Sequence, residues 1–354
     1  MRVFDRRGVR PVGRAGDLLI SLALPSGIRA TVDPRGATLV DLWVPDREGR
    51  LDDILLGHEV PGQGPRMFYG STVGRYANRI AGAAFTLDGQ AHRLAANDGP
   101  NCLHGGPEGF DARDWQVVVP DEASVTLRLV SPDGDQGFPG RLTAQVAYAL
   151  SEDDAGARLD ITMTATTDRA TPVSLTNHAY VNLGGARDAA RLRGVGDHRL
   201  SVAAARLVPV DAAAIPLAEA PVAVEGTPFD FRHPARIGDR LRVGHPQLLA
   251  VRGIDHCFCL YGAGFRQAAR LEHPETGRVM AVWTDQPGLQ VYSGNWLDGT
   301  HRGKDGVAYR MGDAICLEPG AWPDAPNRPD FPPAILRPGE RYLHRMALVF
   351  PTPR

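Results

Sequence analysis

The chain has 354 residues, of which 43% are hydrophobic and 23% are charged. This composition is ordinary for a globular protein and argues against disorder, and the length is sufficient to bury a large core. With 39 Lys plus Arg and 41 Asp plus Glu, the formal net charge is −2. The chain therefore lacks a strong field of one sign that would attract nucleic acid or anionic lipid, and we expect no nucleic acid and no membrane as a partner.

Targeting signals and cysteine usage favour a cytoplasmic protein. No apolar stretch approaches the roughly 18 residues of a membrane span. Residues 1–16 are basic, but the apolar run 18–24 behind them is short and lacks a clear cleavage site, so we predict no signal peptide. The cysteines form no C-x-x-C pair, which favours reduced thiols in the cytoplasm; they are Cys102, Cys257, Cys259 and Cys316.

Alternation of apolar and polar residues, the pattern of half-buried strands, recurs along the chain, whereas no window shows a helical apolar stripe. Residues 85–87 and 92–94 flank Asp88-Gly89, a pair typical of a tight hairpin turn. Alternating strands are next predicted at 124–129, 142–150 and 157–165. Residues 211–248 are rich in Ala, Pro and Asp and predict a long irregular excursion. A second hairpin is predicted at 269–284, with its turn near 275–277.

Many short strands joined by turns predict an all-β protein, either a sandwich or a barrel. There is no internal repeat, no low-complexity tract and no linker in the sequence. We therefore expect a single domain over residues 1–354, because large β-sandwiches can be this long.

Six segments interrupt the alternation and concentrate polar residues beside Gly and Pro. Loops and strand ends of this kind are where a β scaffold usually carries its functional residues. They are G-R-Y-A-N-R-I-A-G-A-A-F (74–85), N-C-L-H-G-G (101–106), S-L-T-N-H-A-Y-V-N-L-G-G (174–185), G-I-D-H-C-F-C-L (253–260), Q-P-G-L-Q-V-Y-S-G-N (286–295) and C-L-E-P-G-A-W-P-D-A-P-N (316–327).

Taken one at a time, the polar residues of these segments leave several uses open. His104 precedes two glycines, where a backbone can approach a ligand closely, but this segment alone favours a surface loop histidine. His178 suits an acid, a base, a metal ligand or a satisfied interior group. Asp255 and Glu318 follow apolar residues, which predicts partly buried carboxylates with a pairing or functional role. Arg79 is a candidate ion-pair partner for either.

Competing chemistries lack their motifs. The sequence has no H-x-H, no H-E-x-x-H and no Cys/His cluster at zinc spacing, so we expect no metal and no cofactor. Cys257-x-Cys259 would place two thiols on one face of a strand, which is a weak metal signal. There is no phosphate-binding glycine loop and no G-x-S-x-G sequence for a serine hydrolase.

Together, the segments resemble the aldose 1-epimerase family, also called galactose mutarotases. Six markers occur in order between about residues 70 and 342: G-R-Y-A-N-R-I (74–80), N-x-L-H-G-G (101–106), T-N-H-x-Y-x-N-L (176–183), D-H-x-F (255–258), P-G-L-Q-V-Y-S-G-N (287–295) and L-E-P-x-x-x-P-D-A-P-N (317–327). The resemblance implies a large antiparallel β-sandwich, the galactose mutarotase-like supersandwich, with an open sugar-binding cleft. It implies an isomerase of carbohydrate and hexose metabolism that acts on monosaccharides without a cofactor, as a monomer or a homodimer.

The resemblance also implies site residues. His178 matches the position of the family's general acid and Glu318 that of its general base. The matching sugar-contacting positions are Asn78, Arg79, His104, Tyr180, Asp255 and Gln290. This chain departs from the family pattern at Gly320, where Gln is frequent, and at Val181, where Phe is frequent. Both departures could widen the cleft or change which sugar fits.

Mutarotation needs an acid and a base at one anomeric carbon, and Glu318 as carboxylate with His178 as imidazolium would meet that need near neutral pH. Arg79 and His104 are expected to stabilise charge on the ring oxygen, and Trp296 and Trp322 offer flat faces either to the sugar or to the core. Three other functions remain open from the sequence: a non-catalytic sugar-binding protein, a glycosidase using Asp255 and Glu318, and a hexose-6-phosphate 1-epimerase.

Overall fold

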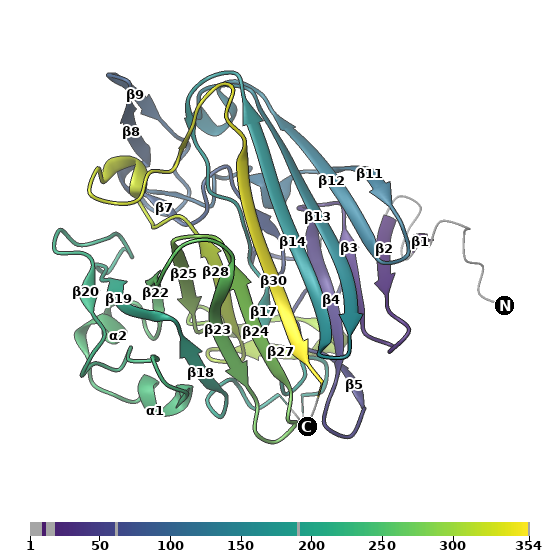
Figure 1. The fold of residues 1–354 in the computed structure, drawn as a ribbon. Helices are drawn as coiled ribbons and strands as arrows, with labels where there is room; N and C mark the ends of the chain where they lie inside the picture. The colour runs from purple at the N-terminus through teal and green to yellow at the C-terminus, as the bar shows by residue number, and fades with distance from the viewer. Residues whose placement is uncertain (1–8, 12–17, 61–62, 190–191, 353–354) are drawn as a thin grey trace.

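The computed structural model describes residues 9–11, 18–60, 63–189 and 192–352. Most of the N-terminal segment 1–16, for which we predicted no signal peptide, lies outside these residues. The largest sheet has nine antiparallel strands and forms one broad layer (Figure 1). In sheet order they are β11 (Gln116–Pro120), β12 (Ser124–Ser131), β13 (Leu142–Asp153), β14 (Gly156–Thr167), β30 (Tyr342–Pro351), β24 (Val279–Thr284), β23 (Arg266–Glu272), β18 (Arg199–Val202) and β21 (Ala235–Arg236).

Two further antiparallel sheets lie behind this layer (Figure 1). A six-stranded sheet has the order β17 (Tyr180–Val181), β28 (Ile315–Gly320), β25 (Gly288–Tyr292), β22 (Asp255–Leu260), β19 (Ala204–Val208) and β20 (Val222–Ala223). A five-stranded sheet has the order β1 (Val9–Pro11), β2 (Leu18–Ala23), β3 (Arg29–Asp33), β4 (Thr38–Pro45) and β5 (Leu51–Asp53).

Short two-stranded ribbons complete the strands: β6 (Thr72–Val73) with β16 (Thr176–Asn177), β7 (Arg79–Ile80) with β10 (Cys102–Leu103), β8 (Ala84–Leu87) with β9 (Gln90–Arg93), β15 (Thr171–Pro172) with β29 (Ile335–Leu336), and β26 (Asp298–Arg302) with β27 (Ala308–Arg310). The described residues form two α-helices, α1 (Ile237–Leu241) and α2 (Pro246–Ala250). In this part of the chain, neither helix has the length and apolar character needed to cross a membrane.

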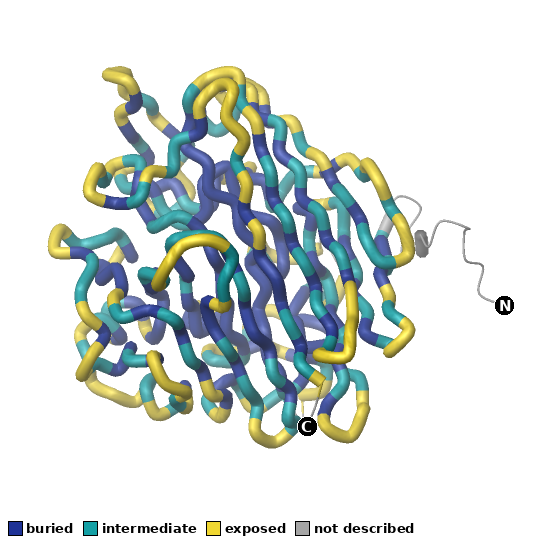
Figure 2. Tube along the Cα trace, in the orientation of Figure 1, coloured by how far each residue is buried: buried dark blue, intermediate teal, exposed yellow. Residues whose placement is uncertain are grey.

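The main core lies between the nine-stranded sheet and the two sheets behind it, and the buried backbone of these central strands is evident in Figure 2. Leu159, Ile161 and Met163 of β14 belong to this core, as do Ile315 and Leu317 of β28. Because side chains alternate across a strand, Cys316 and Glu318 must lie on the opposite face of the six-stranded sheet. That opposite face carries the candidate site.

The predicted elements agree with this architecture. The Asp88-Gly89 hairpin is β8–β9, with Phe85 paired to His92, and the second hairpin is β23–β24. The strands predicted at 124–129, 142–150 and 157–165 lie within β12, β13 and β14, and on β14 buried residues alternate with half-buried ones as expected. Residues 211–248 are irregular except for short strands and helices, as predicted. The large sheets are antiparallel, so the prediction of an all-β antiparallel fold is also confirmed.

Candidate active site

Strand register places four residues in one row across the six-stranded sheet. Tyr180 of β17 is paired with Cys316 of β28, Cys316 with Tyr292 of β25, and Tyr292 with Asp255 of β22. Glu318 and Gln290 form the next row. Directly paired residues of an antiparallel sheet project to the same face, so these side chains gather on the face opposite the main core.

His178 faces this surface from the segment between β16 and β17. Its backbone N–H donates to the carbonyl of Ser71 at 2.9 Å, and its carbonyl accepts from the N–H of Gly70 at 2.9 Å. The imidazole lies between two aromatic rings, with Tyr180 stacked at 5.0 Å and Phe68 stacked at 5.9 Å. These contacts fix the plane of the imidazole before any substrate binds.

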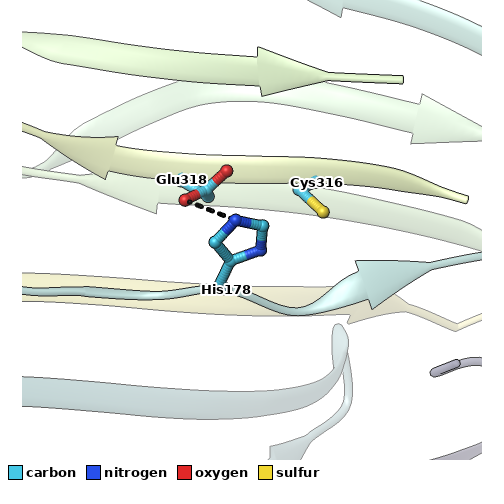
Figure 3. Close-up of side chains that lie close together, drawn as sticks. All are labelled: His178, Cys316 and Glu318. Atoms are coloured by element: carbon cyan, nitrogen blue, oxygen red, sulfur yellow. Dashed lines mark ion pairs between the residues drawn. The ribbon is translucent and has the colours of Figure 1, made fainter. Parts of the chain in front are cut away.

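The imidazole and the Glu318 carboxylate meet inside the protein. Nε2 of His178 lies 3.6 Å from Oε2 of Glu318 (Figure 3), and the two residues are each 5% exposed. His178, between β16 and β17, and Glu318 of β28 are far apart in the sequence, so the fold brings together the two residues to which the resemblance assigned the acid and base roles. The separation is slightly longer than a direct hydrogen bond.

Asn78 and His104 hold each other in place at the junction of β7 and β10. The backbone N–H of Asn78 donates to Nδ1 of His104 at 3.1 Å, and the backbone N–H of His104 donates to the carbonyl of Asn78 at 3.1 Å. Burial lowers the pKa of His104 well below its usual value, so the ring is neutral. Because Nδ1 accepts a hydrogen bond, the ring proton is on Nε2, which makes Nε2 a donor.

Gly105, which follows His104, allows two backbone segments of the protein to pack closely together. A Cβ on Gly105, which has φ +85°, would lie 2.0 Å from the carbonyl oxygen of Gly74. At Gly105 the close approach of backbone is therefore made to the 74–75 segment of the protein itself.

Arg79 does not form the ion pair that we considered with Asp255 or Glu318. Its Nε donates to Oδ2 of Asp98 at 2.7 Å. Arg79 lines the same cavity as the two buried carboxylates, and its positive charge acts to lower the pKa of both. Asp98 therefore positions the guanidinium, a role that no motif in the sequence indicated.

Asp255 and Gln290 form a buried polar pair. Nε2 of Gln290 donates to Oδ1 of Asp255 at 2.6 Å, which fixes the orientation of the amide because the reverse orientation would place two oxygens in contact. Oε1 of Gln290 is buried and has no protein partner among the described residues. This oxygen is available to accept a hydrogen bond from a hydroxyl group.

A cavity of about 180 Å³ joins these elements. All eight of the sequence-predicted residues line it, together with Arg66, Met67, Phe68, Leu103, Tyr292 and Trp296. Trp296 is 53% exposed, and the Arg252 guanidinium lies 4.5 Å from the ring centroid on one of its faces. The indole borders the cavity, where it can pack against the apolar face of a small polar ligand.

Burial changes the protonation of the central pair. It raises the pKa of Glu318 well above its ordinary value, with the Asp255 charge adding to the effect, and it lowers the pKa of His178 to about 4. Burial thus disfavours the charged form of both groups in the free protein and opposes the imidazolium–carboxylate arrangement that we expected near neutral pH. The uncharged pair and the charged pair contain the same number of protons.

The sequence did not indicate that Phe68 and Tyr292 line the cavity. It also suggested that Val181 and Gly320, where this chain departs from the family pattern, could affect the cleft. Phe68 lies in a loop with φ +61°, and no local pattern marks it as a site residue. Val181 packs in the main core, and neither Val181 nor Gly320 is among the residues that line the cavity in the described part of the chain. Trp322 stacks edge-on against Phe331 and is also outside the lining. We therefore do not expect these three residues to shape the cavity directly.

Comparison with known proteins gives a consistent family. A family model described as aldose 1-epimerase matches residues 19–349. The chain is 43% identical over 320 residues to the galactose mutarotase of Bos taurus, covering 90% of this chain and 89% of that protein. It is 40% identical over 331 residues to the aldose 1-epimerase of Escherichia coli K12, covering 92% of each.

Solved structures agree. An aldose epimerase homologue from C. elegans has a TM-score of 0.85 at 31% identity, covering 95% of this chain and 99% of that one. A galactose 1-epimerase from Lactobacillus acidophilus has a TM-score of 0.82 at 28% identity, covering 97% of each. The antiparallel fold and the cavity with its buried imidazole and carboxyl therefore belong to a carbohydrate isomerase. This chain is a member of the aldose 1-epimerase family.

Proposed function

We propose that this protein is a mutarotase that interconverts the α and β anomers of free aldoses, with His178 as acid and Glu318 as base. The observation that carries the assignment of roles is the 3.6 Å separation of Nε2 of His178 and Oε2 of Glu318 inside one cavity. A proton donor and a proton acceptor at this spacing can act on two oxygens bound to the same carbon.

The reaction requires only proton transfers. The Glu318 carboxylate takes the proton of the C1 hydroxyl, Nε2–H of His178 donates to the ring oxygen, and the bond between C1 and the ring oxygen breaks to give the open aldehyde. Rotation about C1–C2 presents the other face of the carbonyl, and closure reverses both transfers. Each positioned transfer contributes typically about 10²–10⁴-fold to the rate.

The pair has to move its proton before the first step. Burial favours the uncharged forms of both residues in the free protein, which places the proton on Glu318 in preference to His178. A bound sugar supplies hydroxyl donors to the carboxylate, and the Arg79 charge already favours its ionised form, so binding shifts the proton toward Nε2 of His178. The pair then has the charges that ring opening requires, without exchange of a proton with water.

The remaining lining residues have positioning roles. Nε2–H of His104 is a donor for the ring oxygen or a neighbouring hydroxyl, while Oε1 of Gln290 and the free oxygen of Asp255 accept from hydroxyls. We assign sugar contacts to Asn78, Arg79 and Tyr180 as well, because each lines the cavity. Trp296 offers its exposed face at the mouth.

The cations at the cavity argue against a sugar phosphate as the substrate. Arg66 and Arg79 are the cationic side chains that line it in the described part of the chain, and each is ion-paired, to Asp111 at 2.6 Å and to Asp98 at 2.7 Å. A phosphate would have to compete with these carboxylates. A free aldose, with hydroxyls in place of the phosphate, fits the cavity better.

We also propose that the chain acts as one domain and, as a monomer or a homodimer, works in the cytoplasm. One hydrophobic cluster spans the three large sheets, which supports a single domain. The four cysteines are free thiols, which is consistent with a reducing compartment.

Polarimetry tests the proposed activity. The rotation of freshly dissolved α-D-galactose, α-D-glucose, D-xylose and L-arabinose is followed with and without protein. We expect at least one sugar to reach equilibrium much faster than in buffer, at a rate proportional to protein concentration. If none of these sugars is accelerated, the proposal is wrong, and tight binding of a sugar without acceleration would instead identify a non-catalytic sugar-binding protein.

A further inference from the structure

A thiol lies beside His178 and Glu318 and is not used in the proposed reaction. Cys316 and Glu318 are two residues apart on β28, so both side chains project to the face from which His178 approaches. Figure 3 shows the imidazole beside both of these side chains. One nitrogen of His178, Sγ of Cys316 and one oxygen of Glu318 all lie within 4.8 Å of one another.

The three groups are buried, and one of their polar atoms has no hydrogen-bond partner among the described residues. Cys316 is 0% exposed, and His178 and Glu318 are each 5% exposed. Nδ1 of His178 is buried without a hydrogen-bond partner among the described residues. A buried polar atom with no partner is uncommon in folded proteins and indicates that the surroundings of the imidazole can accept a further group.

These ligand types belong to a particular class of ion. Imidazole nitrogen, thiolate sulfur and carboxylate oxygen are the donors that bind Zn²⁺, with metal–ligand distances of about 2.0–2.3 Å. Hard cations such as Mg²⁺ prefer oxygen donors alone, so the thiol selects for a softer ion. The three donor atoms would have to close by about 1 Å to reach tetrahedral spacing, a movement within the range of side-chain rotation.

We propose that His178, Cys316 and Glu318 form a binding site for a thiophilic divalent cation, Zn²⁺ or Cd²⁺, that inhibits the enzyme reversibly. The inhibitory effect rests on the proposed roles of His178 and Glu318, whereas cation binding does not. A bound ion takes the lone pairs of the imidazole and the carboxylate, so neither can transfer a proton to or from a sugar.

Cation binding is balanced by proton release. The thiol of Cys316 becomes a thiolate as the sulfur–metal bond forms, and its proton leaves to solvent, as does any proton that the Glu318 carboxyl holds. Nothing is oxidised or reduced. Competition with sugar follows from the geometry, because His178 and Glu318 line the cavity and the ion enters through it.

Co²⁺ is the direct probe of this site, because a cobalt–thiolate bond gives a charge-transfer band in the near ultraviolet. We expect the wild-type protein to bind one Co²⁺ with this band and Zn²⁺ to displace it. Cys316→Ser should lose the band and bind at least tenfold more weakly. Cys259→Ser, which removes a half-buried thiol on β22, is the matched control and should retain the band.

Activity gives the second readout. Zn²⁺ should slow mutarotation by the wild-type protein and by Cys259→Ser, and a chelator should restore it. Cys316→Ser should keep the basal rate and resist the same Zn²⁺ concentration. Should Cys316→Ser fold poorly by circular dichroism, Cys316→Ala replaces it, and His178→Asn must also weaken Co²⁺ binding.

Two results would overturn the inference: a wild-type protein that gives no charge-transfer band at saturating Co²⁺, or a band that survives in Cys316→Ser. A band in a protein that accelerates no sugar would leave the cation site in place and refute the proposed function instead. The two proposals therefore fail separately.

Discussion

Nε2 of His178 and Oε2 of Glu318 lie 3.6 Å apart in a buried setting that shifts their pKa values in opposite directions. Burial disfavours both charges, so a single proton that the pair holds can reside on either residue. An acid and a base that share one proton can pass it through a substrate without involving solvent. Most of our predictions follow from this relationship.

Glu318→Gln should lose about 10²–10⁴-fold in kcat, because the amide has nearly the same shape but cannot accept the C1 proton. KM should change little, since the amide oxygen still accepts a hydrogen bond from a sugar hydroxyl. Initial rates by polarimetry over a range of sugar concentrations measure both constants. The exposed Glu122→Gln is the control and should behave as wild type. A near-normal kcat in Glu318→Gln would remove Glu318 from the role of base.

His178→Asn should reduce kcat by a similar factor, because the amide cannot deliver a proton to the ring oxygen. The double variant with Glu318→Gln should be much less impaired than the product of the two single effects, since residues that act as a unit are not additive. Polarimetry of the four proteins gives this comparison. Fully multiplicative losses would mean that the two residues act independently.

The pH dependence of kcat/KM should show an acid limb well below the ordinary pKa of histidine. The pair carries the one proton that catalysis needs between the lowered pKa of His178, about 4, and the raised pKa of Glu318. Below about pH 4 a second proton blocks the base. Above the raised pKa of Glu318 the only proton is lost, so activity falls again. The profile is measured after subtraction of the buffer rate, and an acid limb near pH 6.5 would contradict this account.

Asp255→Asn should raise KM, because it removes a charged acceptor for sugar hydroxyls and disturbs the 2.6 Å hydrogen bond from Gln290. A loss of roughly 1.5–3 kcal/mol in binding is expected for a hydrogen bond to a charged group, which corresponds to a change in KM of about ten- to a hundredfold. kcat should fall less than in Glu318→Gln. A lower kcat with unchanged KM would instead place Asp255 in the proton transfers.

Stability depends on the only lysine of the chain, Lys304, which is buried. Its Nζ donates to Oδ2 of Asp53 at 2.6 Å and to the carbonyls of Val40 and Leu55 at 2.6 and 2.7 Å. Lys304→Met would leave the fully buried carboxylate of Asp53 with less compensation, and breaking a buried pair in this way costs about 3–5 kcal/mol. Urea unfolding measures the loss, with the exposed Arg128→Met as the control. A loss below about 1 kcal/mol would show that this pair contributes little.

Much of the fold and the site was predictable because their signals are local. Alternation revealed β12, β13 and β14, and the ordered motifs placed all eight predicted residues at one cavity. The helices α1 and α2 have five residues each, too short for a helical pattern to be recognised.

The features that escaped prediction depend on long-range packing. Phe68 reaches His178 only because the 68–71 loop pairs with the backbone of His178, and Asp98 holds Arg79 across a turn. The pKa values of His178 and Glu318 follow from burial, which a sequence does not specify. Val181 could be assigned to the core only once the opposite faces of β17 were known.

The most direct test of the central claim is magnetisation exchange between the two anomeric protons of an equilibrated aldose, observed by NMR with no net reaction. The sugar is the one that the wild-type protein accelerates by polarimetry. The account predicts exchange cross-peaks with wild-type protein that disappear in both His178→Asn and Glu318→Gln under the same conditions. Cross-peaks of wild-type intensity in either variant would contradict it.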